Sequence, residues 1–311
     1  MHSTFASVRE EAHALAQRTL GTVAINNAPL NIPQELLPLL ERLVSPTAHP
    51  HTLLAIATAD AVVIDQHQRT LGERIIRFIV LDKDGHLDIT PLPGTTLELD
   101  IVLIKHGVHA TLSALNTTDA TIRQEFMIDH DAKLTLVVGH LGAAGTYTRQ
   151  STLLGPGASL DDKEFVVGGR DLALDNVVVH AARHTKGDVL QCGVISGGSA
   201  TATGMLRVLP GSQDTKTFLA EKWLLLSPDA RAKAIPGLEI EANDVKASHS
   251  ATVQPIDEQH VFYLQARGIG KDEARAMIVE GFVGPVIDNW PVVAERQTLR
   301  ERALATLGRA A

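Results

Sequence analysis

The feature of this sequence that most constrains its fold is a long series of short β-strand patterns beginning near residue 52. Strand-favouring residues alternate with polar ones, and the patterns recur about every ten residues. Turn sequences such as DKDG at 82–85 and GPG at 155–157 separate them. Strands are predicted at 53–56, 62–64, 75–81, 87–89, 97–104, 110–115, 122–128, 134–138, 165–167, 172–179, 189–195 and 205–209.

No helical pattern interrupts this series, which excludes a fold of alternating strands and helices. A β-sandwich, a β-barrel or a β-solenoid remains, and the period of two does not choose among them. We find no fixed-period repeat of the kind that marks a regular solenoid. A chain of 311 residues is long enough for one large domain or two ordinary ones.

Helical periodicity flanks the strand region on both sides. Apolar residues at three- and four-residue steps predict helices at 3–20 and 34–43. After Thr252 a helix is expected to begin at an Asp257 N-cap, a second to end or kink at Pro285, and a third to start near Val292. The predicted regions are therefore an N-terminal helical region at 1–50, a β core at 51–253 and a C-terminal helical region at 254–311.

Composition indicates which partners are unfavourable and which cellular compartment fits the protein. The net charge of −8 disfavours nucleic acid and anionic membranes as partners. Cys192 is the single cysteine, so no internal disulfide can form, and the opening Met-His-Ser-Thr does not resemble an export signal. We therefore expect a reducing cytoplasm. No run of about eighteen apolar residues predicts a membrane span.

Residues 238–269 contain the most specific pattern. An alternating strand at 238–242 leads to a polar segment around His249, and the helix with the Asp257 N-cap follows. The words LEIEANDVKASHSAT (238–252), DEQHVFYLQARGI (257–269) and EARAMIVEGFVGPV (273–286) stand in this order. In these three words the chain resembles the SufB/SufD family, the scaffolds of the SUF iron–sulfur cluster assembly system.

The resemblance implies a mainly β fold, an irregular right-handed parallel β-helix core flanked by helical N- and C-terminal regions. It also implies a non-catalytic scaffold that partners a SufC-type ATPase through residues 257–285 and a SufB-type subunit, or a second copy of itself, through the β core. A homodimeric scaffold of a minimal SUF system is the alternative. The iron–sulfur cluster would be transient and shared with the partner.

By the same resemblance, His249 is a candidate cluster ligand at the dimer interface. Ser248, Ser250 or Asp244 could orient its second ring nitrogen. The other interpretation is a surface or hydrogen-bonded structural histidine. Ala247 stands where SufD commonly has cysteine, and Ser250 stands where SufB has glutamate, so the chain is closer to SufD and needs thiolates from a partner.

The two helices after Asp257 carry more apolar residues than they can bury between themselves, which favours a docking surface for the ATPase. The alternative is that these residues pack on the β core. The candidate partner-binding residues are Phe262, Tyr263, Leu264, Arg267, Met277, Ile278 and Phe282.

Other chemistry-bearing residues have ordinary interpretations. Cys192 lies within a strand and is expected to be a small buried apolar residue. Four histidines are expected to be solvated or to stabilise turns: His106, His109, His180 and His184. No P-loop is present, so the chain is not expected to be an ATPase. A different function, a β-solenoid enzyme acting on polysaccharide, would use carboxylates such as Asp161, Asp162, Asp171 and Asp175, but aromatic sugar platforms are missing.

Overall fold

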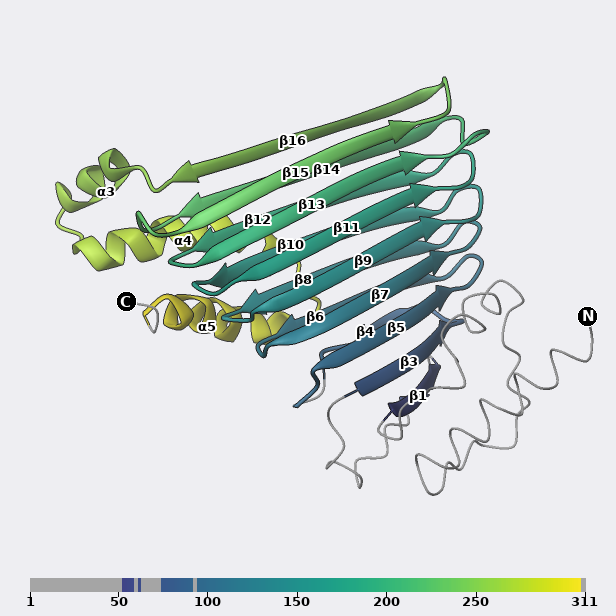
Figure 1. Cartoon of the computed structure of the whole chain (residues 1–311), viewed down its shortest axis with the longest axis horizontal. Coiled ribbons are helices and arrows are strands. Elements are labelled where there is room, and N and C mark those ends of the chain that lie inside the picture. The colour runs from purple at the N-terminus through teal and green to yellow at the C-terminus, as the bar shows by residue number, and fades with distance from the viewer. Residues whose placement is uncertain (1–51, 59–60, 63–73, 92–93, 309–311) are drawn as a thin grey trace, which may run out of the picture.

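The computed structural model describes residues 52–58, 61–62, 74–91 and 94–308. The helices predicted at 3–20 and 34–43, and with them the predicted N-terminal region at 1–50, lie outside these residues. Figure 1 shows a stack of strands that runs from β1 to β16, followed by a short group of helices. No helix in the described ranges is long and apolar enough to cross a membrane.

The strands form two sheets, and from β3 onward consecutive strands alternate between them. All neighbouring strands are parallel except the β1–β2 pair. In spatial order, the nine-stranded sheet contains β15 (Arg231–Ile240), β13 (Ser199–Val208), β11 (Leu172–His180), β9 (Gly145–Leu153), β7 (Ala120–Ile128), β5 (Leu97–Ile104), β3 (Arg74–Leu81), β1 (Thr52–Thr58) and β2 (Ala61–Val62). The seven-stranded sheet contains β16 (Val245–Pro255), β14 (Thr215–Leu225), β12 (Lys186–Ile195), β10 (Ser159–Gly168), β8 (Lys133–Leu141), β6 (His109–Asn116) and β4 (Gly85–Asp88).

This alternation makes the protein a parallel β-solenoid of about six turns, which selects one of the three folds left open by periodicity. The register also explains why no fixed repeat is detectable. Leu97 pairs with Thr121, 24 positions further on, whereas Ser199 pairs with Arg231, 32 positions further on. Each turn can lengthen because the added residues enter the connections and the strand ends, while the paired strands stay in register.

Three local predictions were wrong. No strand was predicted where β14 (Thr215–Leu225) lies. No strand was predicted where β9 lies, because its inward positions include the polar Arg149 and Ser151, both buried, so apolar alternation is missing. The polar segment around His249 is the middle of the eleven-residue strand β16. Residue-for-residue pairing with β14 supplies its backbone hydrogen bonds, and this outweighs its polar composition.

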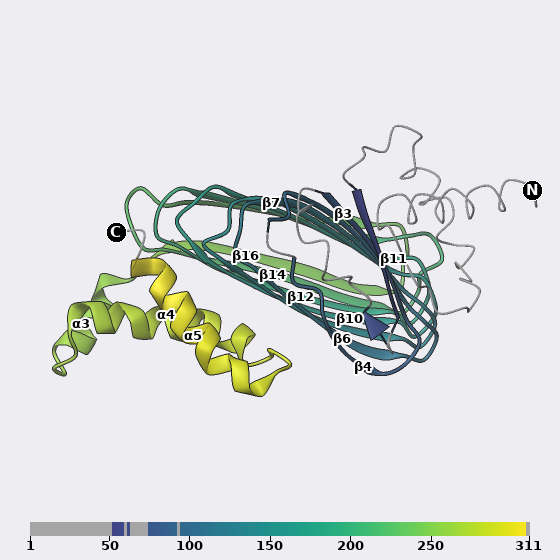
Figure 2. The ribbon, with the colours of Figure 1, turned by 90° about the horizontal axis from the view of Figure 1, so that it is seen from below.

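The core lies between the two sheets, where inward aliphatic and aromatic side chains such as Phe126, Leu134 and Leu136 pack together. A second cluster lies on the outer face of the seven-stranded sheet, where the C-terminal helices cover β8, β10 and β12. Figure 2 shows these helices against that sheet, well separated from the nine-stranded one. The helical elements are α3 (Glu258–Gln265), α4 (Lys271–Ile287), η3 (Val293–Glu295) and α5 (Arg296–Gly308).

The structure confirms one predicted helix boundary and corrects another. The Asp257 carboxylate caps α3 by accepting a hydrogen bond from the backbone N–H of Gln259 at 2.8 Å. The second helix does not end at Pro285, because α4 continues through it to Ile287; the predicted alternative, a kink at Pro285, stays a prediction. Val286 and Ile287 are completely buried, and their packing on the sheet compensates for the backbone hydrogen bond that a proline cannot donate.

Candidate functional site

The C-terminal end of the solenoid is uncovered in the described part of the chain. β15 and β16 are each the last strand of their sheet, with a hydrogen-bonded neighbour on one edge only (Figure 1). Their side chains are exposed or half-buried along their full length. Ile235, Leu238, Ile240 and Val253 are among the exposed apolar residues. Unpaired strand edges with exposed apolar side chains are surfaces onto which another chain can add.

His249 lies at the middle of this open end. It pairs in register with Leu219 of β14, which is buried in the core, and paired residues of neighbouring strands point to the same face. The imidazole therefore belongs to the inward-facing row but is exposed, because no further turn covers it. Within the described ranges its ring has no hydrogen-bond partner, so none of the predicted partners Ser248, Ser250 and Asp244 is hydrogen-bonded to it.

Glu221 occupies the next position of the inward row on β14, beneath Ala251. Its side chain is 0% exposed, and neither carboxylate oxygen has a hydrogen-bond partner in the described structure. Gly204 on the opposite sheet leaves it room, because a Cβ at that position would lie 2.7 Å from Oε1. Burial raises the pKa of Glu221 to about 7. One turn below His249 there is thus a carboxyl group that can take up or release a proton near neutral pH.

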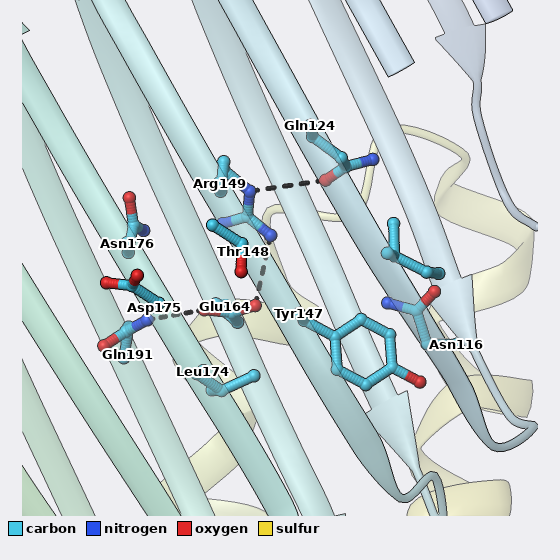
Figure 3. Close-up of a pocket in the computed structure, with 11 residues that line it drawn as sticks. Asn116, Gln124, Tyr147, Thr148, Arg149, Glu164, Leu174, Asp175, Asn176 and Gln191 are labelled. Carbon is cyan, nitrogen blue, oxygen red and sulfur yellow. Dashed lines mark hydrogen bonds and ion pairs between the residues drawn. The ribbon is translucent and has the colours of Figure 1, made fainter. Parts of the chain in front are cut away.

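A row of polar residues continues inward from Glu221. Glu221, Gln191 and Glu164 are paired in register on β14, β12 and β10. The Gln191 amide donates to Glu164 Oε2 at 2.6 Å, while its own carbonyl oxygen has no described partner. Figure 3 shows both side chains beside a small internal cavity with room for roughly one water molecule. One polar row therefore runs through the otherwise apolar interior of the solenoid, from β14 to β10.

Arg149 on β9 is the cation of this interior network. Its Nη1 donates to both carboxylate oxygens of Asp162 at 3.0 and 3.1 Å. Its Nη2 donates to Glu164 Oε1 at 3.1 Å, a contact that Figure 3 shows. His140 Nε2 lies 2.8 Å from the same Glu164 oxygen. Burial opposes ionisation of Glu164, but Arg149 and His140 together lower its pKa to about 2. This network holds β8, β9 and β10 together across the two sheets.

A pH-dependent stability follows from Glu221. The folded carboxyl has a pKa of about 7 against an ordinary value of 4.5, so the folded state binds its proton more tightly. The free energy of unfolding therefore falls as pH rises from 4.5 to 7, and the penalty persists above pH 7. We expect Glu221→Gln to be more stable than the wild type by an amount that grows by roughly 2.5 kcal/mol between pH 5 and pH 8 in urea denaturation.

The matched control for that measurement is Glu239→Gln. Glu239 lies on β15 in an exposed ion pair with Arg207. Its effect should stay within about 1 kcal/mol at both pH values, because exposed ion pairs contribute little. If Glu221→Gln gave the same stability difference at pH 5 as at pH 8, the raised pKa would be contradicted.

The single cysteine and two of the four histidines have structural roles. Cys192 is buried in the cluster under the helices, and burial raises the pKa of its thiol to about 11, which confirms the prediction of a small apolar residue. His180 was predicted to be solvated or to stabilise a turn, and the structure supports the second alternative. It is fully buried, its Nδ1 lies 2.8 Å from Thr185 Oγ1, and burial lowers its pKa to about 4. His184 does stabilise a turn contact, with Nδ1 2.8 Å from Asp214 Oδ2.

The carboxylates that would serve a polysaccharide-active enzyme do not form an accessible pair. Asp162 is completely buried by its contacts with Arg149 and Asn176, Asp161 pairs with Lys163, and Asp171 accepts hydrogen bonds from Ser199. Asp175 lines the small internal cavity. Nothing in the described structure therefore favours that second function.

The candidate docking residues on α3 and α4 divide into two groups. Phe262, Tyr263 and Met277 are 71%, 54% and 47% exposed. The Arg267 guanidinium lies 4.6 Å from the centre of the Tyr263 ring and is exposed with it. The other three, Leu264, Ile278 and Phe282, are half-buried and pack partly against the cluster beneath the helices. The sequence did not separate these groups, because neither helix has a strong apolar stripe.

The described residues define a β-solenoid whose C-terminal end is uncapped, with a ligand-capable histidine on that end and an apolar patch on an attached pair of helices. The family model of the SufBD core domain of the SUF iron–sulfur cluster assembly system matches residues 102–282. This match covers more than half of the chain, and the protein belongs to the SufBD family.

Curated relatives agree with that assignment. The iron–sulfur cluster assembly protein SufD of Bacillus subtilis is 29% identical over 204 residues, which are 64% of this chain and 46% of the relative. The chloroplastic protein ABCI7 of Arabidopsis thaliana is 30% identical over 220 residues, 69% of this chain and 46% of the relative. A SufBD family protein of Mycobacterium leprae is 32% identical over 164 residues, 49% of this chain and 41% of the relative. The chain spans about half the length of these relatives.

Proposed function

We propose that this protein is a SufD-like scaffold subunit for iron–sulfur cluster assembly, completed at its open end by a SufB-type subunit or by a second copy of itself. The observation that carries the proposal is the placement of His249, exposed and without a described partner, in the inward row of the uncapped strand β16. The cluster would be the cargo, held transiently at the junction of the two chains. The catalytic step, ATP hydrolysis, would belong to a partner.

The number of cluster ligands that this chain offers at its open end supports a site shared by two chains. Cluster iron is normally held by thiolates, with histidine as an occasional replacement. Cys192 is the single thiol of this chain and is buried under the helices, away from the open end. His249 is the one Cys or His residue within β15 and β16. A chain that offers one imidazole at this end needs thiolates from whatever chain covers it.

The choice between the two completing partners is open to direct measurement. The protein should be mixed with SufB-type and SufC-type proteins of the same source and analysed by size-exclusion chromatography with light scattering. A complex containing all three supports the heteromeric scaffold, whereas a complex of this chain and the ATPase alone supports the homodimeric one. Absence of any complex with either protein would contradict the proposal.

For the ATPase, we propose docking on the exposed residues of α3 and α4 within residues 257–285. Phe262 and Tyr263 present adjoining aromatic surface, and Met277 adds a flexible apolar side chain of the kind that adapts to partner surfaces. Arg267 holds the Tyr263 ring through its cation–π contact.

We expect Phe262→Ala to weaken binding of the SufC-type ATPase by about tenfold or more, because exposed aromatic residues are typical anchors of interfaces. The stability of the isolated chain should change by less than about 0.5 kcal/mol, since the ring is mostly in solvent. The control is Val293→Ala, an apolar residue that is 68% exposed on η3, outside the proposed surface. Calorimetric titration with the ATPase measures the affinity of both variants. Equal affinities for the wild type and Phe262→Ala would place the docking surface elsewhere.

A further inference from the structure

A second group of ligand-capable side chains lies far from the open end, on turns between the two sheets. His106 lies in the turn between β5 and β6, and His130 and Asp131 lie in the equivalent turn one rung further, between β7 and β8. These turns are at the edge of the solenoid opposite α3–α5 in Figure 1. One ring nitrogen of each histidine and a carboxylate oxygen of Asp131 lie within 4.8 Å of one another, and all three residues are exposed.

The contacts within this group cannot all be hydrogen bonds at the same time. His106 Nδ1 lies 2.8 Å from the His130 carbonyl oxygen and 3.0 Å from His130 Nδ1, which in turn lies 3.3 Å from Asp131 Oδ2. The carbonyl and the carboxylate can only accept hydrogen bonds. A proton on His106 Nδ1 alone leaves a bare His130 nitrogen facing the carboxylate. A proton on His130 Nδ1 alone leaves a bare nitrogen facing the carbonyl, and protons on both bring two N–H groups together.

The backbone holds these donors in place. Gly107 N–H donates to the His130 carbonyl at 3.0 Å, and Asp131 N–H donates to the Pro156 carbonyl of the next rung at 2.9 Å. Asp131 has a φ of 54°, a left-handed conformation that aspartate tolerates better than most residues. Gly157 leaves room for its carboxylate, because a Cβ there would lie 2.0 Å from Oδ1. Three successive turns therefore fix the group before any ligand arrives.

We propose that His106, His130 and Asp131 form a binding site for a divalent first-row transition-metal ion. Three lone-pair donors lie close together here, and a dication bound between them would remove the conflict that protons leave. Two imidazoles and one carboxylate suit Fe²⁺, Co²⁺, Ni²⁺ or Zn²⁺ better than Mg²⁺, which prefers oxygen ligands. With three protein ligands the ion keeps positions open to water, as in exchangeable rather than closed structural sites.

The sequence did not reveal this group because its members are 24 positions apart. Only the stacking of consecutive turns brings His130 to His106, and the two rings lie with their centres 4.9 Å apart. His109, the nearer neighbour in sequence, is not part of the group. It is the first residue of β6, and its backbone N–H donates to Asp84 Oδ1 at 2.7 Å. This proposal does not depend on the function proposed for the open end.

The test is a Co²⁺ titration of the full chain without an affinity tag, followed by calorimetry and by visible absorption of the bound ion. His106→Ala/His130→Ala should bind one Co²⁺ fewer per chain than the wild type. Asp131→Asn, which keeps the side-chain shape and tolerates the same backbone conformation, should weaken that site by about tenfold or more. A parallel titration with Mg²⁺ should give no binding at this site.

The matched control is His184→Ala, which removes an exposed histidine that pairs with a single carboxylate, Asp214, on the same edge of the solenoid. It should bind Co²⁺ as the wild type does. Circular dichroism checks that each variant is folded, and binding is compared among folded variants. Wild-type stoichiometry and affinity in His106→Ala/His130→Ala would overturn the proposal, as would loss of the same Co²⁺ in His184→Ala.

Discussion

Replacing His249 with alanine should reduce cluster formation in the reconstituted scaffold complex to less than about a tenth of the wild-type level, without unfolding the chain. No other imidazole or thiol lies on β15 or β16, so nothing at the open end can take its place. The ring is exposed and has no described hydrogen-bond partner, so its loss should cost less than about 0.5 kcal/mol of stability. Anaerobic reconstitution followed by absorption spectroscopy measures the cluster, and urea denaturation measures the stability.

Two further variants separate a ligand from a structural residue. His249→Cys supplies a thiolate at the same position and should restore part of the cluster, since thiolates are the common ligands of iron–sulfur clusters. His109→Ala removes an exposed histidine at the start of β6, far from the open end, and should leave cluster formation unchanged. Full cluster formation by His249→Ala in a complex of unchanged composition would exclude His249 as a ligand. Loss of the complex itself would instead show that His249 is needed for the association of the two chains.

The second large effect is expected in the interior. Arg149→Met should destabilise the protein by about 3–5 kcal/mol at pH 7, because it leaves Asp162 and Glu164 buried without their cation. The loss should be smaller at low pH, where the two carboxyl groups can be protonated. Arg149 is the main reason that the pKa of Glu164 is near 2 in the wild type. Removing Arg149 therefore makes Glu164 easier to protonate. Urea denaturation at pH 7 and pH 4 measures both effects.

A matched arginine on the surface provides the control. Arg170 pairs with Asp119, and both side chains are more than half exposed. Arg170→Met should therefore cost less than about 1 kcal/mol. Combining Arg149→Met with Asp162→Asn and Glu164→Gln should recover at least half of the lost stability, because no uncompensated charge remains in the core. A cost for Arg149→Met no larger than that for Arg170→Met would show that the buried network does not stabilise the solenoid.

How far the sequence predicted the fold can be judged from individual strands. β5 was predicted at its observed bounds, because its run of Leu, Ile and Val is buried on both sides of the strand. β9 was missed because the inward positions at its centre hold Arg149 and Ser151. Polar residues that face the interior make a buried strand look like a loop, and their partners on β10 cannot be recognised from a single chain segment.

The candidate sites show the same contrast. His249 was singled out by a local sequence word, and the structure places it on an exposed edge strand. Glu221 was passed over, although burial makes it the least satisfied carboxyl of the inward row. The division of the docking helices into exposed Phe262 and half-buried Phe282 was equally invisible, since it depends on how α4 lies against β10 and β12.

The sequence by itself determined that the chain is mainly β, that its helices follow the strands at the C-terminal end, and that His249 stands in a family-specific word. Alternation, caps and motifs are local, and a single segment carries them. Only the tertiary structure decided which turns stack, and therefore which distant residues meet: Arg149 with Asp162 and Glu164, His106 with His130, and Glu221 beneath the open end. In a solenoid whose turns vary from 22 to 32 residues, no fixed spacing in the sequence encodes those neighbours.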